Sequence, residues 1–437
     1  MSSRILLLNG EIMTEAAASV ADKVILGLLL LAMSGLFFLS DDHRYGVVFF
    51  QESLAAVSIA SFLYILAMRR HLLGNIDWSV LLLALLVFFI PILSSYLYFA
   101  QPFQFGILEE RRSLLYFSSF LAMLVLGGRH YTSIDIEKVL KIVFWVALIW
   151  ATLNAFDLVP RHQGFSFSVH KEQFAEGFQS LDERFETRFI NGSIIVFLYP
   201  FFLLARKQYL KALLPVILLV LYMVFINQTR SLAALGVLML VFIGLMRGRK
   251  EFNLMLMVAV PVFFLCAYFL YYLYSFLFGE PVAFYDMYRN MEFRLVFNKV
   301  IADWFIPHGH LSLQFDGGFK QYFGINIYTY DIGLAGNLYK YGFVYLFLFA
   351  IFLYAVLAIY RQHRNEFSII LAAMFVSSCF MMPFYGEFGR MGIEFSVLLV
   401  LARIRGNQYE TGKYIACVRR GGASGPSYPP YGANAVA

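Results

Sequence analysis

Arg230 ends a short polar stretch between two apolar runs, and this arrangement suits the binding of an anion. The stretch NQTR (227–230) follows apolar residues over 213–226 and precedes apolar residues over 232–246. A guanidinium group matches the oxygens of a phosphate, and the N–H groups that begin the following helix also favour negative charge. The alternative is an arginine that extends from an apolar helix end to the polar groups around it.

Basic side chains recur in the segment MYRNMEFRLVFNKV, residues 287–300. Arg294 lies beside the apolar stripe of this segment, so it could point into a cavity as a second anion ligand. Arg289 is close in sequence and is a candidate substrate-binding residue. A solvated helix face is the simpler alternative for this group. Arg188 pairs in helical spacing with Arg184, and ion pairing with a neighbouring acidic residue or a lipid headgroup explains that pair equally simply.

Asp331 stands where a polar loop becomes an apolar run, so it is our candidate for a general base. A carboxylate there could take a proton from a sugar hydroxyl, or it could cap the start of the following helix. His308 and His310 are further candidate bases or substrate contacts, although histidines near proline and glycine in loops are more often structural. Tyr330 could stack on a sugar or belong to an aromatic belt at a membrane interface.

The sequence offers no recognisable site for a metal, a nucleotide or another cofactor. The cysteines, Cys266, Cys379 and Cys417, are scattered, and no zinc, iron–sulfur or glycine-rich phosphate-binding pattern occurs. No Asp-x-Asp pair suggests a metal–nucleotide site. A donor that depends on a bound nucleotide or metal ion therefore has no obvious site in this chain.

Composition indicates the environment that must position these residues. The chain is 60% hydrophobic and 14% charged, with a mean hydropathy of +0.70, whereas soluble domains carry about 25% charged residues. Apolar runs of about 17–25 residues, enough to span a bilayer as a helix, recur along it. We predict an all-α polytopic membrane protein. The net charge of +6 is explained by basic loops, so no nucleic-acid partner is expected.

The apolar runs predict about twelve transmembrane helices, and their basic ends predict the topology. The predicted spans are roughly 24–40, 46–68, 79–99, 113–128, 139–157, 189–205, 212–227, 231–247, 253–278, 331–360, 366–384 and 392–403. Basic residues at helix ends gather in the loops that would be cytoplasmic if the N-terminus is inside: Arg69, Arg70, Lys138, Lys141, Arg206, Lys207, Arg247, Arg249, Lys250, Arg361, Arg364, Arg403 and Arg405. Both termini are therefore predicted to be cytoplasmic.

Two long loops are left on the outer face, at about 157–188 and 279–330, and loops of this length are usually functional. Each carries an apolar stripe in helical spacing, which predicts amphipathic helices that lie on the membrane or cap a cavity. The stripes are Phe174, Phe178, Leu181, Phe185 and Phe189 in the first loop, and Phe293, Val296, Phe297, Val300, Ile301 and Trp304 in the second. Residues 1–405 are predicted to form one membrane domain, and 406–437 a disordered cytoplasmic tail.

Three motifs together resemble the O-antigen ligase/polymerase superfamily of bacterial integral membrane glycosyltransferases. They are TRSLAALGVLMLVFIGLMRGRK, which begins at position 229, FRLVF in the second outer loop, and Asp331 with ten residues before Gly342-Phe343. The resemblance covers about residues 225–349 and is diffuse. Ligases of the family carry a His-Asn pair at the position of Asp331 here, and this departure favours the polymerase branch.

The resemblance implies a reaction and a place for it. A glycan carried on undecaprenyl diphosphate would be transferred to the end sugar of another lipid-linked repeat unit, without metal or cofactor. Arg230 and Arg294 would hold the diphosphate, Asp331 would be the base, and Arg188 a weaker diphosphate or glycan contact. The site would face the periplasm from the bacterial inner membrane, among membrane lipids. The family leaves room for a chain-length regulator as partner protein.

Three other functions remain open. A ligase would transfer finished glycan to lipid A core or to a protein, with His308 or His310 in place of the missing histidine. A flippase or transporter of lipid-linked oligosaccharide would need ionisable residues in the middle of the membrane and two related halves; the apolar runs hold few ionisable residues, with Glu52 the main exception, and no internal repeat is evident. A cell-shape or division polymerase acting on lipid-linked peptidoglycan precursors would have a different motif layout.

Replacing Arg230 tests its predicted role. Arg230→Ala should abolish polymer formation while protein level and membrane insertion stay unchanged, as measured by product gels and immunoblots of membranes. Arg230→Lys should restore little, because a single ammonium does not reproduce the bidentate guanidinium. Normal product length in Arg230→Ala would remove Arg230 from the mechanism.

Overall fold

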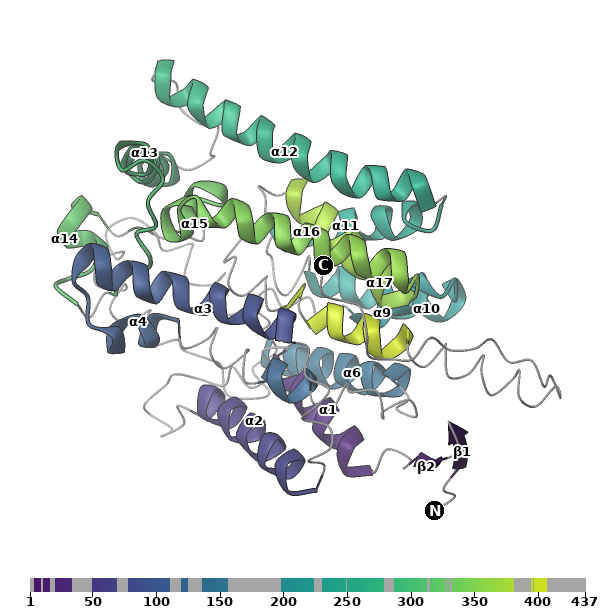
Figure 1. The fold of residues 1–437 in the computed structure, drawn as a ribbon. Helices are drawn as coiled ribbons and strands as arrows, with labels where there is room; N and C mark the ends of the chain where they lie inside the picture. The colour runs from purple at the N-terminus through teal and green to yellow at the C-terminus, as the bar shows by residue number, and fades with distance from the viewer. Residues whose placement is uncertain are drawn as a thin grey trace.

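The structure, a computed structural model of the chain, is a bundle of helices with a short hairpin at the N-terminus (Figure 1). It describes residues 4–8, 11–15, 20–33, 49–68, 78–110, 119–124, 136–155, 198–223, 230–248, 250–278, 287–312, 315–325, 327, 329, 332–380, 394–395 and 397–406. The predicted first outer loop and the predicted tail beyond residue 406 lie outside these ranges.

Most of the described helices lie in the predicted apolar runs, but a hairpin and the short helices Phe103–Glu109 and Phe319–Phe323 were not predicted. The hairpin is antiparallel and consists of β1 (Arg4–Leu8) and β2 (Glu11–Glu15), in which Leu6 faces Met13. The helices are α1 (Val20–Met33), α2 (Phe49–Met68), α3 (Trp78–Phe99), α4 (Phe103–Glu109), α6 (Ile136–Ala155), α9 (Leu198–Ala205), α10 (Tyr209–Leu221), α11 (Arg230–Leu245), α12 (Lys250–Phe278), α13 (Met287–Ala302), α14 (Phe319–Phe323), α15 (Leu334–Tyr341), α16 (Val344–Gln362) and α17 (Glu366–Phe380). Residues 119–124 and 397–406 are also helical.

Three of these helices are long and apolar enough to cross a membrane. They contain the segments Leu81–Phe99, Lys250–Tyr274 and Val344–Gln362, and shorter apolar helices accompany them at Ser58–Met68, Tyr209–Leu221, Ala234–Leu245 and Glu366–Phe380. The predicted helical class is therefore confirmed apart from the hairpin. The number of twelve crossings stays a prediction.

The helix α17 forms the centre of the bundle. All its residues from Glu366 to Cys379 are buried, and it packs against α9, α11, α12 and α16. A helix that is apolar on every side must be surrounded on every side. Its small residues, among them Ala372, Ala373 and Ser377, allow the neighbouring helices to approach closely.

The helix α12 has the opposite exposure, with apolar side chains on its outer surface. Met255, Phe263 and Leu270 are each more than 60% exposed. In Figure 1 this helix lies along one side of the bundle, outside α16. An apolar surface of this extent is unusual on a soluble monomer and suits contact with lipid.

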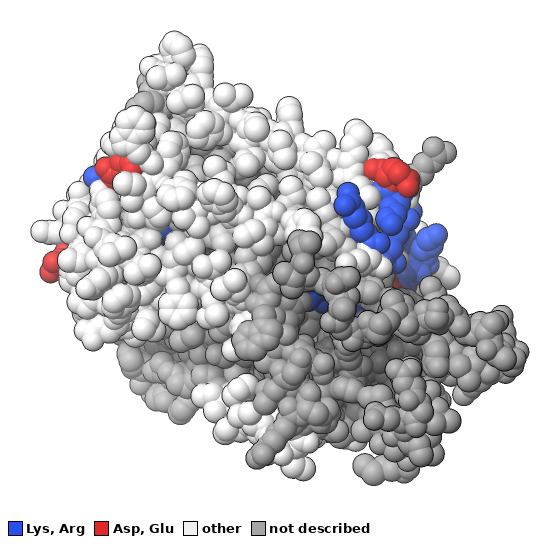
Figure 2. Space-filling model, in the orientation of Figure 1, with Lys and Arg blue, Asp and Glu red and all other residues white. Residues whose placement is uncertain are grey.

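Several of the basic loops predicted to share one side of the membrane do lie together, at one end of the bundle (Figure 2). Arg206, which follows α9, forms ion pairs with Glu137 of α6 and Glu366 of α17. Arg405 also approaches Glu366, at 3.4 Å. Arg364 donates to the carbonyl of Gly248 between α11 and α12. We call this region the basic end.

The helix α13 lies at the other end of the bundle and is seen nearly end-on in Figure 1, across the direction of α3 and α12. The predicted helix in the second outer loop is thus confirmed, with Phe293, Val296, Phe297 and Val300 buried. The prediction was wrong for Trp304, which is 86% exposed. The helix ends at Ala302, and positive φ angles at Trp304 (53°) and Phe305 (59°) turn the chain away from the stripe.

The predicted span 331–360 is two helices, not one. The helices α15 and α16 are separated at Gly342, whose φ is +58° and where an added Cβ would lie 2.3 Å from the carbonyl oxygen of Phe305. The N-cap of α15 is Gly333, so the helix begins beyond Asp331. All residues of α15 are buried, and the helix packs against α13. The break at Gly342 therefore makes α15 a separate short helix in the interior of the bundle.

A proline in α3 determines how this end is assembled. Pro91 has no N–H, so it cannot bond the carbonyl of Val87 one turn earlier. The hydroxyl of Tyr341 in α15 donates to that carbonyl over 3.2 Å. The loop 303–312 enters the same place through Gly309, where an added Cβ would lie 2.1 Å from the carbonyl oxygen of Pro91. The helix α15 and this loop therefore contact α3 at the same place, next to Pro91.

The contact at Gly309 can be tested against a glycine with the same backbone conformation. Gly309 (φ +78°) and Gly324 (φ +74°) both adopt left-handed angles, but an added Cβ at Gly324 meets nothing within 4 Å. Gly324→Ala should cost only the left-handed strain of about 1–2 kcal/mol. Gly309→Ala should cost about 4 kcal/mol or more, because α3 must move. Equal losses in unfolding of the detergent-solubilised protein would contradict this assembly.

Candidate functional site

The predicted site residues divide into three groups in the structure. Arg188, Tyr330 and Asp331 lie outside the described residues. Arg230 is the first residue of α11 and Arg289 lies in α13; their backbones are described and their side chains are not. Arg294, His308 and His310 are described with their side chains, and all three lie at the end that carries α13.

The positions of Arg230 and Arg294 follow from the directions of two consecutive helices. At the basic end, the carbonyl of Met246, just after α11, accepts hydrogen bonds from Asn253 and Tyr360, both at 2.7 Å. The helix α11 is about 24 Å long, so Arg230 lies that far from the basic end. The helix α12 returns in the same direction and reaches α13, where the rings of Tyr272 and Phe293 are 4.4 Å apart.

Arg294 lies on the exposed side of α13, while its neighbours Phe293 and Val296 face the protein. The position agrees with the expectation that this arginine stands beside the apolar stripe rather than under it. An exposed guanidinium on a helix that crosses the end of a bundle can meet a ligand from the surrounding phase. The structure thus brings Arg294 and the two histidines to one end of the bundle. The backbone of Arg230 lies about 24 Å from the basic end, at the start of α11.

His308 is completely buried and belongs to a cluster that joins α3, α13 and the loop 303–312. Its Nε2 lies 2.6 Å from Oδ2 of Asp303. Tyr98 donates to the same carboxylate oxygen over 2.5 Å, and Lys299 approaches it to 3.3 Å. The imidazole ring stacks on Tyr339 of α15, with ring centres 4.5 Å apart and an angle of 7°. We call these residues the Asp303 cluster.

The electrostatics of the Asp303 cluster keep the carboxylate ionised. Burial raises the pKa of Asp303, but hydrogen bonds from Tyr98, His308 and Lys299 outweigh it and lower the pKa to about 2. Burial also lowers the pKa of His308, although its bond to Asp303 acts in the opposite direction. A neutral imidazole oriented by a carboxylate is an arrangement that can accept a proton. Because His308 has no exposed surface, however, its geometry here favours a positioning role.

His310 belongs to a second buried cluster, on α4 and α15, which we call the Glu110 cluster. The Nζ of Lys340 lies 2.5 Å from Oε1 of Glu110, and Nδ1 of His310 lies 3.7 Å from the same oxygen. Glu110 and Lys340 are 1% and 2% exposed. Although burial raises the pKa of Glu110, the charge of Lys340 and the hydrogen bond from His310 lower it to about 2.

Neighbouring polar groups extend the Glu110 cluster along the loop 303–312. Gln101 accepts from the backbone N–H of Ser312 over 2.7 Å and donates to the carbonyl of His310 over 3.1 Å. The hydroxyl of Ser312 bonds to Glu109 over 2.7 Å. The loop is therefore fixed to the segment between α3 and α4 by side chains about 200 positions away in sequence.

The predicted base Asp331 is flanked by residues that are packed against α15. Thr329 and Ile332 are both buried. An added Cβ on Gly336 would lie 1.9 Å from the carbonyl oxygen of Thr329, so the backbone approaches α15 as closely as a glycine permits. The two clusters contact the same helix through Tyr339 and Lys340. The helix α15 is thus the element common to the candidate site.

The sequence analysis missed Glu110, Asp303 and Lys340. A signal for Lys340 was present, because a lysine inside the segment NLYKYGF next to an apolar helix requires a partner when it is buried. The partner itself, 230 positions earlier, could not be read from spacing. Among the residues that the structure describes, no three His, Cys, Asp or Glu side chains converge as a metal-binding group.

Comparison of the chain with protein-family models, with curated proteins and with solved structures gave no match in any of the three cases.

The Glu110–Lys340 pair should show strong coupling when its members are replaced. Lys340→Met and Glu110→Gln each leave one buried charge without its partner, so each should cost about 3–5 kcal/mol in free energy of unfolding. The double variant removes both charges and should cost much less than the sum. The free energies of unfolding of the detergent-solubilised wild type, the two single variants and the double variant give a double-mutant cycle. Additive losses would show that the two groups act independently.

Proposed function

We propose that this protein is an integral membrane glycosyltransferase that polymerises lipid-linked oligosaccharides. The glycan on one polyprenyl diphosphate is transferred to the end sugar of a second lipid-linked repeat unit, and the diphosphate lipid leaves. The reaction takes place at the end of the bundle that carries α13, which we assign to the periplasmic face of the bacterial inner membrane.

The observation that carries this proposal is the polarity of the bundle. The described loops with paired basic residues meet at one end, and such loops are typical of the cytoplasmic side. Arg294 lies on α13 at the opposite end, with His308 beside Asp303 just after that helix and His310 beside Glu110 and α15. A site for lipid-linked sugar needs this arrangement, because the polyprenyl tail stays in the membrane while the sugar and diphosphate emerge at its surface.

The chemistry divides between an anion site and a base. A new bond forms between the acceptor oxygen and the anomeric carbon, while the bond from that carbon to the diphosphate oxygen breaks. The diphosphate leaves with the bonding electrons, and Arg230 and Arg294 stabilise its charge. Asp331 accepts the hydroxyl proton. The Asp303 and Glu110 clusters hold α15, against which the buried Thr329 packs two positions before Asp331.

The composition of the spans favours a transferase over a transporter. No Asp, Glu, Lys or Arg occurs in 81–99, 252–274 or 344–360, which are the inner parts of the three candidate spans. Among the described residues, the pairs Asp303–His308 and Glu110–Lys340 lie at the α13 end, and the buried Glu366 pairs with arginines at the basic end. A transporter needs polar or ionisable side chains along its path through the membrane.

A ligase is the second candidate, because His308 contacts the helix that follows Asp331. Its backbone N–H bonds to the carbonyl of Tyr339 over 2.9 Å, and its ring stacks on the same residue. A histidine is therefore supplied to α15 from the loop 303–312, although none stands at position 331. In this function the acceptor would be a lipid A core.

A product assay on the purified protein distinguishes these functions. The lipid-diphosphate-linked repeat unit is the sole substrate, and a chelator is present. We expect a ladder of products that differ by one repeat unit. Transfer only after addition of lipid A core would identify a ligase. Neither product, from a preparation shown to be folded, would reject both transferases in favour of transport.

Two exposed arginines at opposite ends of the bundle, Arg294 and Arg361, allow the role of Arg294 in transfer to be tested against a control. Arg294→Ala should lower the rate of transfer by about 100-fold or more, the usual effect of losing one group that stabilises developing charge. Arg361→Ala, in α16 at the basic end, should change it less than about threefold. Equal rates in the two variants would exclude Arg294 from the anion site.

A further inference from the structure

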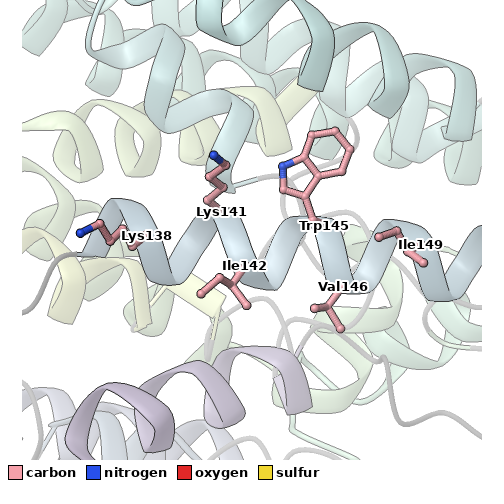
Figure 3. Close-up of a pocket in the computed structure, with 6 residues that line it drawn as sticks. All are labelled: Lys138, Lys141, Ile142, Trp145, Val146 and Ile149. Atoms are coloured by element: carbon pink, nitrogen blue, oxygen red, sulfur yellow. The ribbon is translucent and has the colours of Figure 1, made fainter. Parts of the chain in front are cut away.

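A groove on α6, far from the candidate active site, combines two lysines with an apolar floor (Figure 3). Its volume is about 410 Å³, and it is lined by Lys138, Lys141, Ile142, Trp145, Val146 and Ile149. These residues recur at helical spacing, so they share one side of α6. Ile142 is 60% exposed and Ile149 is 55% exposed.

The opposite side of α6 is already occupied. Val143, Phe144 and Ala147 are almost wholly buried, and the helix packs there against α1 and α9. Among the described residues of α6, these buried ones are not part of the groove, so the groove is a second apolar face of the same helix. An exposed apolar face of this kind suits an apolar ligand.

The charges lie at one end of this face only. Lys138 and Lys141 belong to the first two turns of α6, next to Glu137, which pairs with Arg206 at the basic end. Beyond Lys141 the lining residues as far as Ile149 carry no charge, over about 12 Å of helix. The face thus offers cationic groups at the level where headgroups lie and an apolar track that points into the bilayer.

We infer that this groove binds one anionic glycerophospholipid. The ammonium groups of Lys138 and Lys141 meet the phosphate of the headgroup, and an acyl chain lies along Ile142, Val146 and Ile149. The indole of Trp145 lies one turn beyond Lys141 on the same edge of the groove (Figure 3), and tryptophan is enriched at the interfaces of membrane proteins. Each lysine near an anionic headgroup contributes about a fivefold gain in affinity.

Fluorescence of Trp145 tests the inference directly. The other tryptophans, Trp78, Trp150 and Trp304, are replaced by Phe, and the protein is titrated with brominated phosphatidylglycerol or brominated phosphatidylcholine in mixed micelles. We expect both lipids to quench Trp145, with phosphatidylglycerol about 25-fold more effective, the product of the two fivefold gains. Lys138→Gln with Lys141→Gln should reduce this preference to about one. Inorganic phosphate should not reverse the quenching, because the acyl chain supplies part of the affinity.

Two controls separate a site from general surface charge. Lys207→Gln with Lys211→Gln removes two exposed lysines of the same end and should leave the preference intact. Lys138→Arg with Lys141→Arg keeps both positive charges, so the preference for phosphatidylglycerol should also remain. Equal quenching by the two lipids, no quenching by either, or a preference that survives the Lys138 and Lys141 replacements would each overturn the inference.

Discussion

One missing hydrogen bond determines how the α13 end of the bundle is built. Pro91 leaves the carbonyl of Val87 without a donor in α3, and an apolar environment makes such a group costly. Tyr341 supplies the donor from α15, and Gly309 lets the loop 303–312 lie directly against the proline. His308, one residue earlier, then stacks on α15. The two buried clusters depend on this arrangement, because the loop 303–312 supplies Asp303 and His308 to one and His310 to the other, and both clusters contact α15.

The two ends of the molecule use charge in different ways. At the basic end, Arg364 meets the carbonyl of Gly248, and Arg206 meets the partly exposed Glu137 and the buried Glu366. The arginines themselves keep part of their surface exposed. At the α13 end, Glu110 and Lys340 are enclosed and compensate each other. A chain with a net charge of +6 can therefore present a cationic surface at the basic end, while the buried charges of Glu110 and Lys340 at the α13 end compensate each other.

The sequence predicted those parts of the fold that depend on the pattern of apolar residues alone. Long apolar runs gave helices at the expected places, and the stripe through Phe293 and Val300 identified α13 before its position was known. The break at Gly342 was not predicted, because the reason for it is the carbonyl of Phe305, a contact made only in the folded chain. The histidines of the candidate site were visible in the sequence, whereas Glu110 and Asp303 became relevant only through partners that folding supplies.

The length of α12 has a consequence for the membrane itself. Its 29 residues measure about 44 Å, whereas the hydrocarbon core of a bilayer is about 30 Å thick. An upright α12 would lift α13 about 14 Å above the hydrocarbon boundary, while a steep tilt would draw it down to the headgroups. Hydrophobic mismatch of this size thickens the bilayer or tilts the helix. In a membrane that α12 crosses, bilayer thickness would therefore set the height of α13 above the hydrocarbon core, and a change of lipid composition would change that height.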